Sequence, residues 1–208
     1  MIINKIISKC YLLFSQFKYR ILMNSFGNHS KIISPMMISN HKFISIGKNV
    51  FIRNGIRLEV VDPQNDIVIK IGNNVNIEQN VHIVGRCKIE IGNNVTITGG
   101  CSIVDVIHPY EDIDDSRKIG DRISTSFYPV SIGDYSFIGY GSHINPGVSI
   151  GKYCIIGAKS VVTKNIPDYC VVAGTPAKII KKYCHKNKMW IKVTNFTNIQ
   201  DKKVYLNE

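Results

Sequence analysis

The chain has 208 residues, a formal net charge of +11 and a hydrophobic content of 44%, which is enough apolar material for one domain with a buried core. Its ordinary content of glycine, proline and charged residues excludes wholesale disorder. The positive charge suits an anionic membrane or an anionic small molecule, and because no nucleic-acid-binding motif accompanies it, we expect no nucleic-acid partner.

The first segment, residues 1–26, has the spacing of an amphipathic helix. Its apolar residues fall on one stripe, made of Ile3, Ile6, Ile7, Cys10, Leu13, Phe14, Phe17 and Ile21. Basic residues interrupt the segment and no small-residue cleavage site follows it, which is unlike a signal peptide or a membrane span. Two interpretations stay open. The helix packs on the rest of the protein, or residues 1–23 rest on the inner face of an anionic membrane.

A repeat of six residues fills residues 27–166. In its most regular part, large aliphatic residues recur every six positions, and glycine follows most of them: Ile132, Ile138, Ile144, Ile150, Ile156 and Val162. This period fits neither an α-helix nor an alternating strand, but it fits a short strand plus a corner, three times per triangular coil. We expect the glycines to permit corner conformations that are closed to other residues. The sequence therefore predicts an all-β fold, a parallel β-helix of about six coils.

Three features interrupt the repeat. Steps of two residues, from Ile44 to Ile46 and from Ile89 to Ile91, predict widened corners. Residues 104–131 form a long insertion rich in Asp and Ser. A loop of this length inside a compact repeat is more often functional than not.

The repeat ends near Pro167, and residues 167–208 form a C-terminal extension. Gly174 and Pro176 predict a turn within it. The lysine-rich part, residues 181–208, is expected to be a helix or a loosely held tail.

The motifs in and after the insertion occur in a specific order. They are H-P at 108–109, P-V-S-I-G-D-Y at 129–135, I-N-P-G-V-S-I-G at 144–151, G-A-K-S-V-V-T-K-N-I-P at 157–167 and A-G-T-P-A-K at 173–178. Over residues 27–182 the chain resembles the hexapeptide-repeat acyltransferases, and within them the maltose/galactoside acetyltransferases and the O-acetyltransferases of bacterial capsule and O-antigen synthesis. The resemblance implies left-handed coils, a homotrimer with active sites between neighbouring chains, and acetyl-CoA as acetyl donor. Where this family usually has Trp, the chain has Phe137, which is expected to pack against the cofactor or the core.

Acetyl transfer to a hydroxyl needs a general base, and an imidazole with its ordinary pKa of about 6.5 suits this role. Of the six histidines only His108 lies in the insertion, and the resemblance places it on the family's catalytic His-Pro pair, so we expect it to be the base. Asp105, three residues earlier, is the first candidate to orient its ring. Glu111, Asp112 or a backbone carbonyl are alternatives.

The remaining candidate residues would bind the two substrates. His82 is expected to line the acceptor cleft or to be an exposed surface residue, and Glu78 and Asn80 just before it are further candidates for acceptor binding. The resemblance implies acetyl-CoA contacts at Tyr140, Ala158, Thr163, Lys164, Lys178 and Lys181. The last two would pair with its phosphates, although both also read as surface lysines of a basic tail. The histidines are too scattered for a metal site, and none is expected.

The leading hypothesis is an O-acetyltransferase that acts on a sugar hydroxyl in a bacterial surface polysaccharide, of a capsule or O-antigen, or in its precursor. The alternative is a small free acceptor: a galactoside, an antibiotic or a nucleotide-linked amino sugar. A hypothesis from another class, an inactive scaffold, is disfavoured by the His-Pro pair. No cysteine lies in the insertion and none forms a C-x-x-C pair, so we expect free thiols, a cytoplasmic protein and direct transfer without a covalent intermediate.

Overall fold

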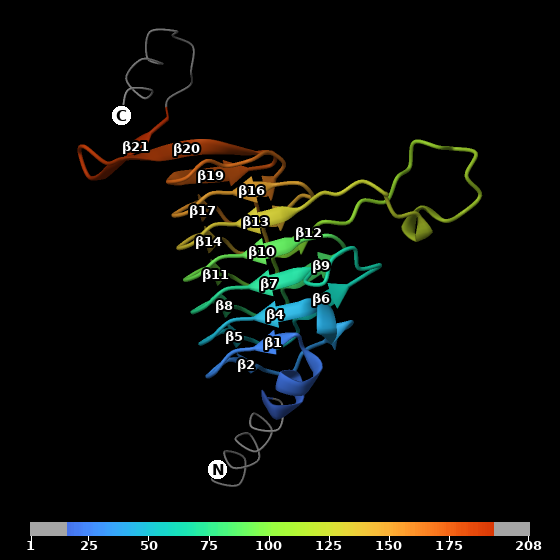
Figure 1. Cartoon of the computed structure of the whole chain (residues 1–208). Helices are drawn as coiled ribbons and strands as arrows, with labels where there is room; N and C mark the ends of the chain where they lie inside the picture. The colour runs from blue at the N-terminus through green and yellow to red at the C-terminus, as the bar shows by residue number, and fades with distance from the viewer. Residues whose placement is uncertain (1–15, 194–208) are drawn as a thin grey trace.

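The computed structural model describes residues 16–193, which form a parallel β-helix whose coils stack in chain order (Figure 1). Three sheets enclose the core, and the chain visits them in rotation. Sheet A contains β1 (Ser25–Phe26), β4 (Ile44–Ile46), β7 (Ile69–Ile71), β10 (Ile89–Ile91), β13 (Val130–Ile132) and β16 (Ser149–Ile150). Sheet C contains β3 (Met37–Ile38), β6 (Arg57–Val60), β9 (His82–Gly85), β12 (Ser102–Val104), β15 (His143–Ile144) and β18 (Val161–Val162).

Sheet B continues beyond the others. It contains β2 (Lys31–Ile32), β5 (Phe51–Ile52), β8 (Asn76–Ile77), β11 (Thr96–Ile97), β14 (Phe137–Ile138), β17 (Ile155–Ile156), β19 (Cys170–Gly174), β20 (Ala177–Cys184) and β21 (Met189–Lys192). Parallel pairing extends to β19, past the predicted limit at residue 166. The predicted parallel β-helix of about six coils is confirmed.

The repeat aliphatics form the core. All six in the regular stretch are at most 2% exposed: Ile132, Ile138, Ile144, Ile150, Ile156 and Val162. Burying each such side chain contributes roughly 1.5–3 kcal/mol. The widened corners predicted from the two-residue steps are wrong, because Ile44 and Ile46 are both buried within one strand, and so are Ile89 and Ile91. In a strand, residues two apart face the same side, so both members of each pair point into the core.

The repeat glycines are needed for close approach between coils. A Cβ on Gly133 would lie 2.5 Å from the carbonyl carbon of Gly151 and from the amide nitrogen of Lys152, where no side chain fits. Positive φ values, which we expected at the repeat glycines, occur instead two residues later, at Tyr135 (φ 61) and Tyr153 (φ 55). The glycines keep the coils at hydrogen-bonding distance rather than supplying a left-handed turn.

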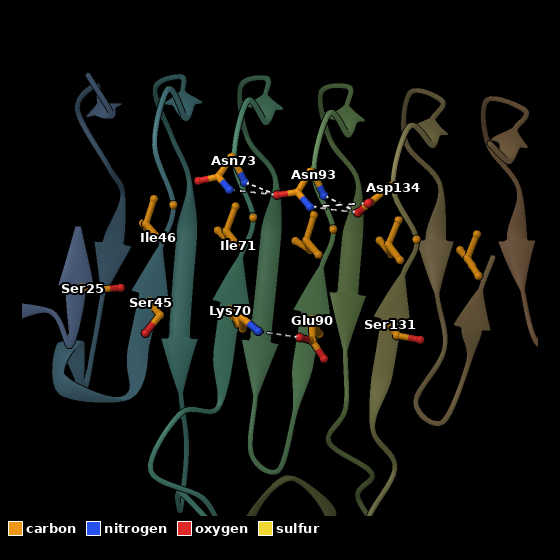
Figure 2. Close-up of a pocket in the computed structure, with 17 residues that line it drawn as sticks. Ser25, Ser45, Ile46, Lys70, Ile71, Asn73, Glu90, Asn93, Ser131 and Asp134 are labelled. Atoms are coloured by element: carbon orange, nitrogen blue, oxygen red, sulfur yellow. Dashed lines mark hydrogen bonds and ion pairs between the residues drawn. The ribbon is translucent and has the colours of Figure 1, made fainter. Parts of the chain in front are cut away.

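A polar groove of about 590 Å³ follows the outer face of sheet A (Figure 2). Along one side of it, Asn93 Oδ1 accepts a hydrogen bond from the Asn73 N–H at 2.9 Å, and Asp134 Oδ1 accepts one from the Asn93 N–H at 2.6 Å. Across its floor, Lys70 pairs with Glu90 at 2.9 Å. These contacts join successive coils, and the groove contains none of the predicted site residues.

Residues 16–22 are helical and precede the first coil. Tyr19 and Met23 are 4% exposed and pack into the core, whereas Phe17 and Ile21 are 65% and 66% exposed. Phe17 and Ile21 are the two residues of the predicted apolar stripe that the structure describes, and both face away from the β-helix. The other residues of the stripe lie outside the described residues. No helix within residues 16–193 has the length and hydropathy needed to cross a bilayer.

The C-terminal extension is neither a helix nor a loose tail over residues 181–192. β20 and β21 add antiparallel strands to the end of sheet B. The ring of Tyr169 stacks on Tyr153 at 5.2 Å and contacts Tyr183 of β20 at 6.3 Å. Aromatic contacts thus attach the extension to the last coil.

Candidate active site

The long insertion leaves the β-helix after β12 and returns at β13, and it projects from the side of the prism (Figure 1). It contains one short 3₁₀ turn, Ile119–Asp121. Its base folds over the outer face of sheet C and encloses a pocket of about 470 Å³. The pocket is lined by Arg57, Glu59, Val61, His82, Val84, Val104, Val106, His108, Gly120 and Ile123. Two predicted site residues, His82 and His108, therefore meet in one pocket.

A backbone carbonyl orients His108. Its Nδ1 lies 2.8 Å from the carbonyl oxygen of Arg122. A carbonyl only accepts, so Nδ1 must carry the proton, and Nε2 of the neutral ring is then left with its lone pair free. This is the tautomer that a general base requires when it takes a proton through Nε2. Of the orienting groups weighed from the sequence, the backbone carbonyl is the one observed.

The expectation that Asp105 orients His108 is wrong. Asp105 is 3% exposed, and its carboxylate accepts hydrogen bonds from the backbone N–H groups of Arg86, Cys87 and Lys88, at 2.5, 2.8 and 2.6 Å. Those three amides form the corner of the preceding coil. Asp105 therefore fastens the start of the insertion to the β-helix and supports His108 only indirectly.

Two charged residues of the pocket floor were missed in the sequence. Arg57 Nε donates to Glu59 Oε2 at 2.7 Å, and the side chain of Glu59 is only 13% exposed. Arg57 lies beside His82 in the register of β6 and β9. Burial lowers the pKa of His82, and the positive charge of Arg57 lowers it further, against the opposing effect of Glu59. His82 and an ion pair thus lie across the pocket from the long insertion, and together they offer donors and acceptors suited to hydroxyl groups.

Glu78 and Asn80 do not line this pocket. Glu78 follows β8 on sheet B, where its carboxylate pairs with Arg53 at 2.7 Å. Asn80 occupies the corner between sheets B and C, with φ 57. Within one chain, the structure brings only His82 of the three predicted acceptor residues to His108.

The predicted cofactor residues fall into two groups. Tyr140 and Ala158 lie at the corner between sheets B and C, where Lys159 Nζ is 4.8 Å from the centre of the Tyr140 ring. Thr163 and Lys164 follow β18, at the corner between sheets C and A. Lys164 and Lys178 line a second pocket of about 480 Å³, next to β20.

Two other residues that were expected near the cofactor lie on sheet B. Lys181 is placed on β20 opposite Val171 and is not among the residues that line the second pocket. Phe137 is 42% exposed on the outer face of sheet B, so it does not pack into the core.

The described cysteines are free thiols, and most are buried. Burial raises the pKa of Cys154 to about 11 and also raises that of Cys101. A protonated thiol is a poor nucleophile, which agrees with direct transfer. In the part of the chain that the structure describes, no cluster of three or more His, Cys, Asp or Glu is placed to hold a metal ion.

Comparisons with known proteins identify the family of the chain. The family model described as bacterial transferase hexapeptide (six repeats) matches residues 129–164. WbbJ of Escherichia coli (strain K12), named a putative lipopolysaccharide biosynthesis O-acetyl transferase, is 33% identical over 83% of this chain and 89% of its own length. The galactoside O-acetyltransferase of the same organism is 33% identical over 70% of this chain and 67% of its own.

Solved structures give the same result. A maltose O-acetyltransferase from Clostridium difficile 630 shares 30% identity at a TM-score of 0.51, covering 79% of this chain and 72% of its own. The N-acyltransferase AntD from Bacillus cereus shares the fold at a TM-score of 0.67 and 23% identity, covering 83% of this chain and 90% of its own. Because WbbJ matches over most of both chains, the protein belongs to the bacterial hexapeptide transferase family and is an acyltransferase with a left-handed β-helix.

Proposed function

We propose that the protein transfers an acetyl group from acetyl-CoA to a hydroxyl of a sugar in a surface polysaccharide or its precursor. The observation that carries this proposal is the contact between Nδ1 of His108 and the Arg122 carbonyl oxygen, 2.8 Å apart, from which the Nδ1–H tautomer follows. The free Nε2 is a base within a pocket whose floor offers Arg57, Glu59 and His82 to an acceptor. Acyl transfer to an alcohol requires at least a base and groups that hold the alcohol beside it. This pocket contains both.

The proposed chemistry is a direct transfer. Nε2 of His108 takes the proton of the acceptor hydroxyl while that oxygen forms a bond to the thioester carbonyl carbon. When the carbon–sulfur bond breaks, the imidazolium returns the same proton to the departing thiolate. His108 thus ends the cycle neutral, and the Nδ1–H bond to Arg122 stabilises the imidazolium formed between the two steps.

The acetyl donor is proposed to lie between two chains of a homotrimer. Two groups of predicted contacts, Tyr140 with Ala158 and Thr163 with Lys164, lie at different corners of one prism. A neighbouring copy of the chain would bring one group next to the other, and Lys164 and Lys178 would then attract the phosphates. Sedimentation of the full-length protein at micromolar concentration tests this arrangement. We expect a trimer, and a fully active monomer would contradict the shared site.

The acceptor is proposed to be a polysaccharide sugar because WbbJ, which matches most of the chain, is named a putative lipopolysaccharide biosynthesis O-acetyl transferase. The galactoside and maltose acetyltransferases favour a small free sugar as the alternative. Mass spectrometry of surface polysaccharides from cells with and without the protein distinguishes the two. Loss of one acetyl group per repeat unit is expected. Unchanged polysaccharide, together with acetylation of free galactosides or maltose by the purified protein, would favour the alternative.

The helix at residues 16–22 is proposed to hold the protein on an anionic membrane, where a lipid-linked acceptor would be found. Its exposed Phe17 and Ile21 support this, together with Lys18 and Arg20 in the same helical segment. Co-sedimentation with vesicles containing anionic lipid should fall when Phe17 and Ile21 are both changed to Ser. Equal binding by both forms would exclude this role for the helix.

A further inference from the structure

The guanidinium group of Arg122 is buried inside the insertion. Its side chain is 11% exposed. Nη1 donates to the carbonyl of Asp112 at 2.8 Å, Nε donates to the carbonyl of Arg117 at 3.1 Å, and Nη2 donates to the carbonyls of Arg117 and Asp115. The Asp115 carboxylate lies 3.5 Å from Nε. All three nitrogen atoms therefore hold the outer turn of the insertion, residues 112–117.

The backbone of the same residue contacts His108, which lines the pocket. Its carbonyl oxygen lies 2.8 Å from Nδ1 of His108. Close by, the Ser124 N–H donates to the Ile107 carbonyl at 2.9 Å, so a second hydrogen bond joins the two legs of the insertion next to this contact. Arg122 thus links two parts of the insertion. Its side chain binds the outer turn, and its backbone carbonyl binds His108.

We propose that Arg122 is a positioning residue for the transfer reaction. By clamping the outer turn, its guanidinium fixes the plane of its own peptide group, and the carbonyl then holds His108 in the Nδ1–H tautomer with Nε2 free. This inference rests on the proposed function, in which His108 is the base. It adds that the tautomer is set by a side chain that contacts neither substrate.

Arg117 provides a matched control. Its side chain is 66% exposed and pairs with Asp115 at 2.7 Å, yet only its carbonyl contacts Arg122. Arg117→Ala removes an arginine from the same turn but leaves every hydrogen-bond acceptor of Arg122 in place.

The first test reads the tautomer directly and needs no activity. Full-length protein labelled with ¹⁵N-histidine is examined by two-bond ¹H–¹⁵N correlation, with His108→Gln used to assign the ring. We expect the Nδ1–H form in the wild type and in Arg117→Ala, and a mixture or the Nε2–H form in Arg122→Ala. Arg122→Lys should resemble Arg122→Ala, because an ammonium group lacks the planar fork that reaches three carbonyls. If the ring stays in the Nδ1–H form in both Arg122 variants, the proposal is wrong.

The second test is a kinetic double-mutant cycle of Arg122→Ala and His108→Ala. Arg122→Ala should lower kcat by about 10- to 100-fold, as a misplaced group does, with the KM for acetyl-CoA unchanged. In the His108→Ala background the same change should have no further effect, because there is no base left to position. Effects that multiply would make Arg122 merely structural and overturn the proposal.

The two tests also separate this inference from the proposed function. Loss of the tautomer in Arg122→Ala, in a protein that acetylates no sugar, would support the positioning role and contradict the function. Full sugar acetylation by Arg122→Ala would contradict the positioning role alone. If Arg122→Ala loses the thermal transition of the wild type, the same two measurements on Arg122→Lys decide the question.

Discussion

The carboxylate of Asp105 is bound by the amide of Cys87 at 2.8 Å, although the two residues belong to different coils. Together with the amides of Arg86 and Lys88, this contact anchors the chain just before His108. Asp105→Ala would leave three backbone donors without their acceptor, two of them at buried residues. We expect a loss of about 3 kcal/mol in the free energy of unfolding, measured with denaturant, and a fall in kcat.

The exposed Asp66 offers a comparison for that change. Asp66→Ala removes a carboxylate from a neighbouring loop and should alter the free energy of unfolding by less than about 0.5 kcal/mol. Equal effects of the two substitutions would show that the buried hydrogen bonds of Asp105 contribute nothing.

The coils could be predicted from the sequence because burial itself has the period of six. Ile138 and Ile156 are core residues in successive coils, and any polar residue at either position would be costly. The role of the glycines was misjudged for a physical reason. In a sequence, Gly133 cannot be told from a glycine with positive φ. Only the structure shows that a side chain at Gly133 would clash with the backbone of Gly151 in the next coil.

The pocket could be predicted only in part. His108 was predicted because it lies in a long insertion within a compact repeat and matches the His-Pro pair of the family that the sequence resembles. Arg57 and Glu59 were missed because they meet His82 only through strand pairing. β6 and β9 pair Arg57 with His82, 25 residues later, and this spacing depends on the loop between β6 and β7. The orientation of Asp105 could not be predicted either. Its carboxylate binds three backbone N–H groups, and every residue except proline has such a group, so the sequence does not mark them.

The stability of the protein should decrease as the pH falls through the range in which free histidine titrates. Burial lowers the pKa of His143, and burial with the charge of Arg57 lowers that of His82, both from 6.5. Below pH 6.5 the unfolded chain therefore binds more protons than the folded one, so stability is fully present above that pH and is lost as the pH falls towards the lowered values. The midpoint of thermal unfolding, measured from pH 7.5 to 5, should decrease, and His143→Gln should flatten this dependence. A curve that keeps its slope in the variant would assign the effect to other groups.

Binding of acetyl-CoA should depend on Lys164 and Lys178, which line one pocket. An exposed pair between lysine and phosphate contributes about 1 kcal/mol or less, so each change to Ala should raise the dissociation constant several-fold, and the difference should shrink at high salt. Isothermal titration at two salt concentrations measures this. Lys48, exposed at the corner between sheets A and B, is the control, and Lys48→Ala should bind as the wild type does. If Lys48→Ala weakens binding as much, the effect is one of net charge and the phosphate site lies elsewhere.

His108→Ala should lower kcat by about 100- to 10,000-fold, the range typical of a positioned base. Affinity for acetyl-CoA should barely change, because the proton moves only in the transition state and not when the donor binds. His82→Ala provides the comparison within the same pocket, because its ring shares the acceptor space but lies on sheet C. It should act mainly on the KM for the acceptor and far less on kcat. If His82→Ala abolishes turnover while His108→Ala keeps most of it, the base is the histidine on the sheet and the carbonyl of Arg122 orients a ring with no part in the chemistry.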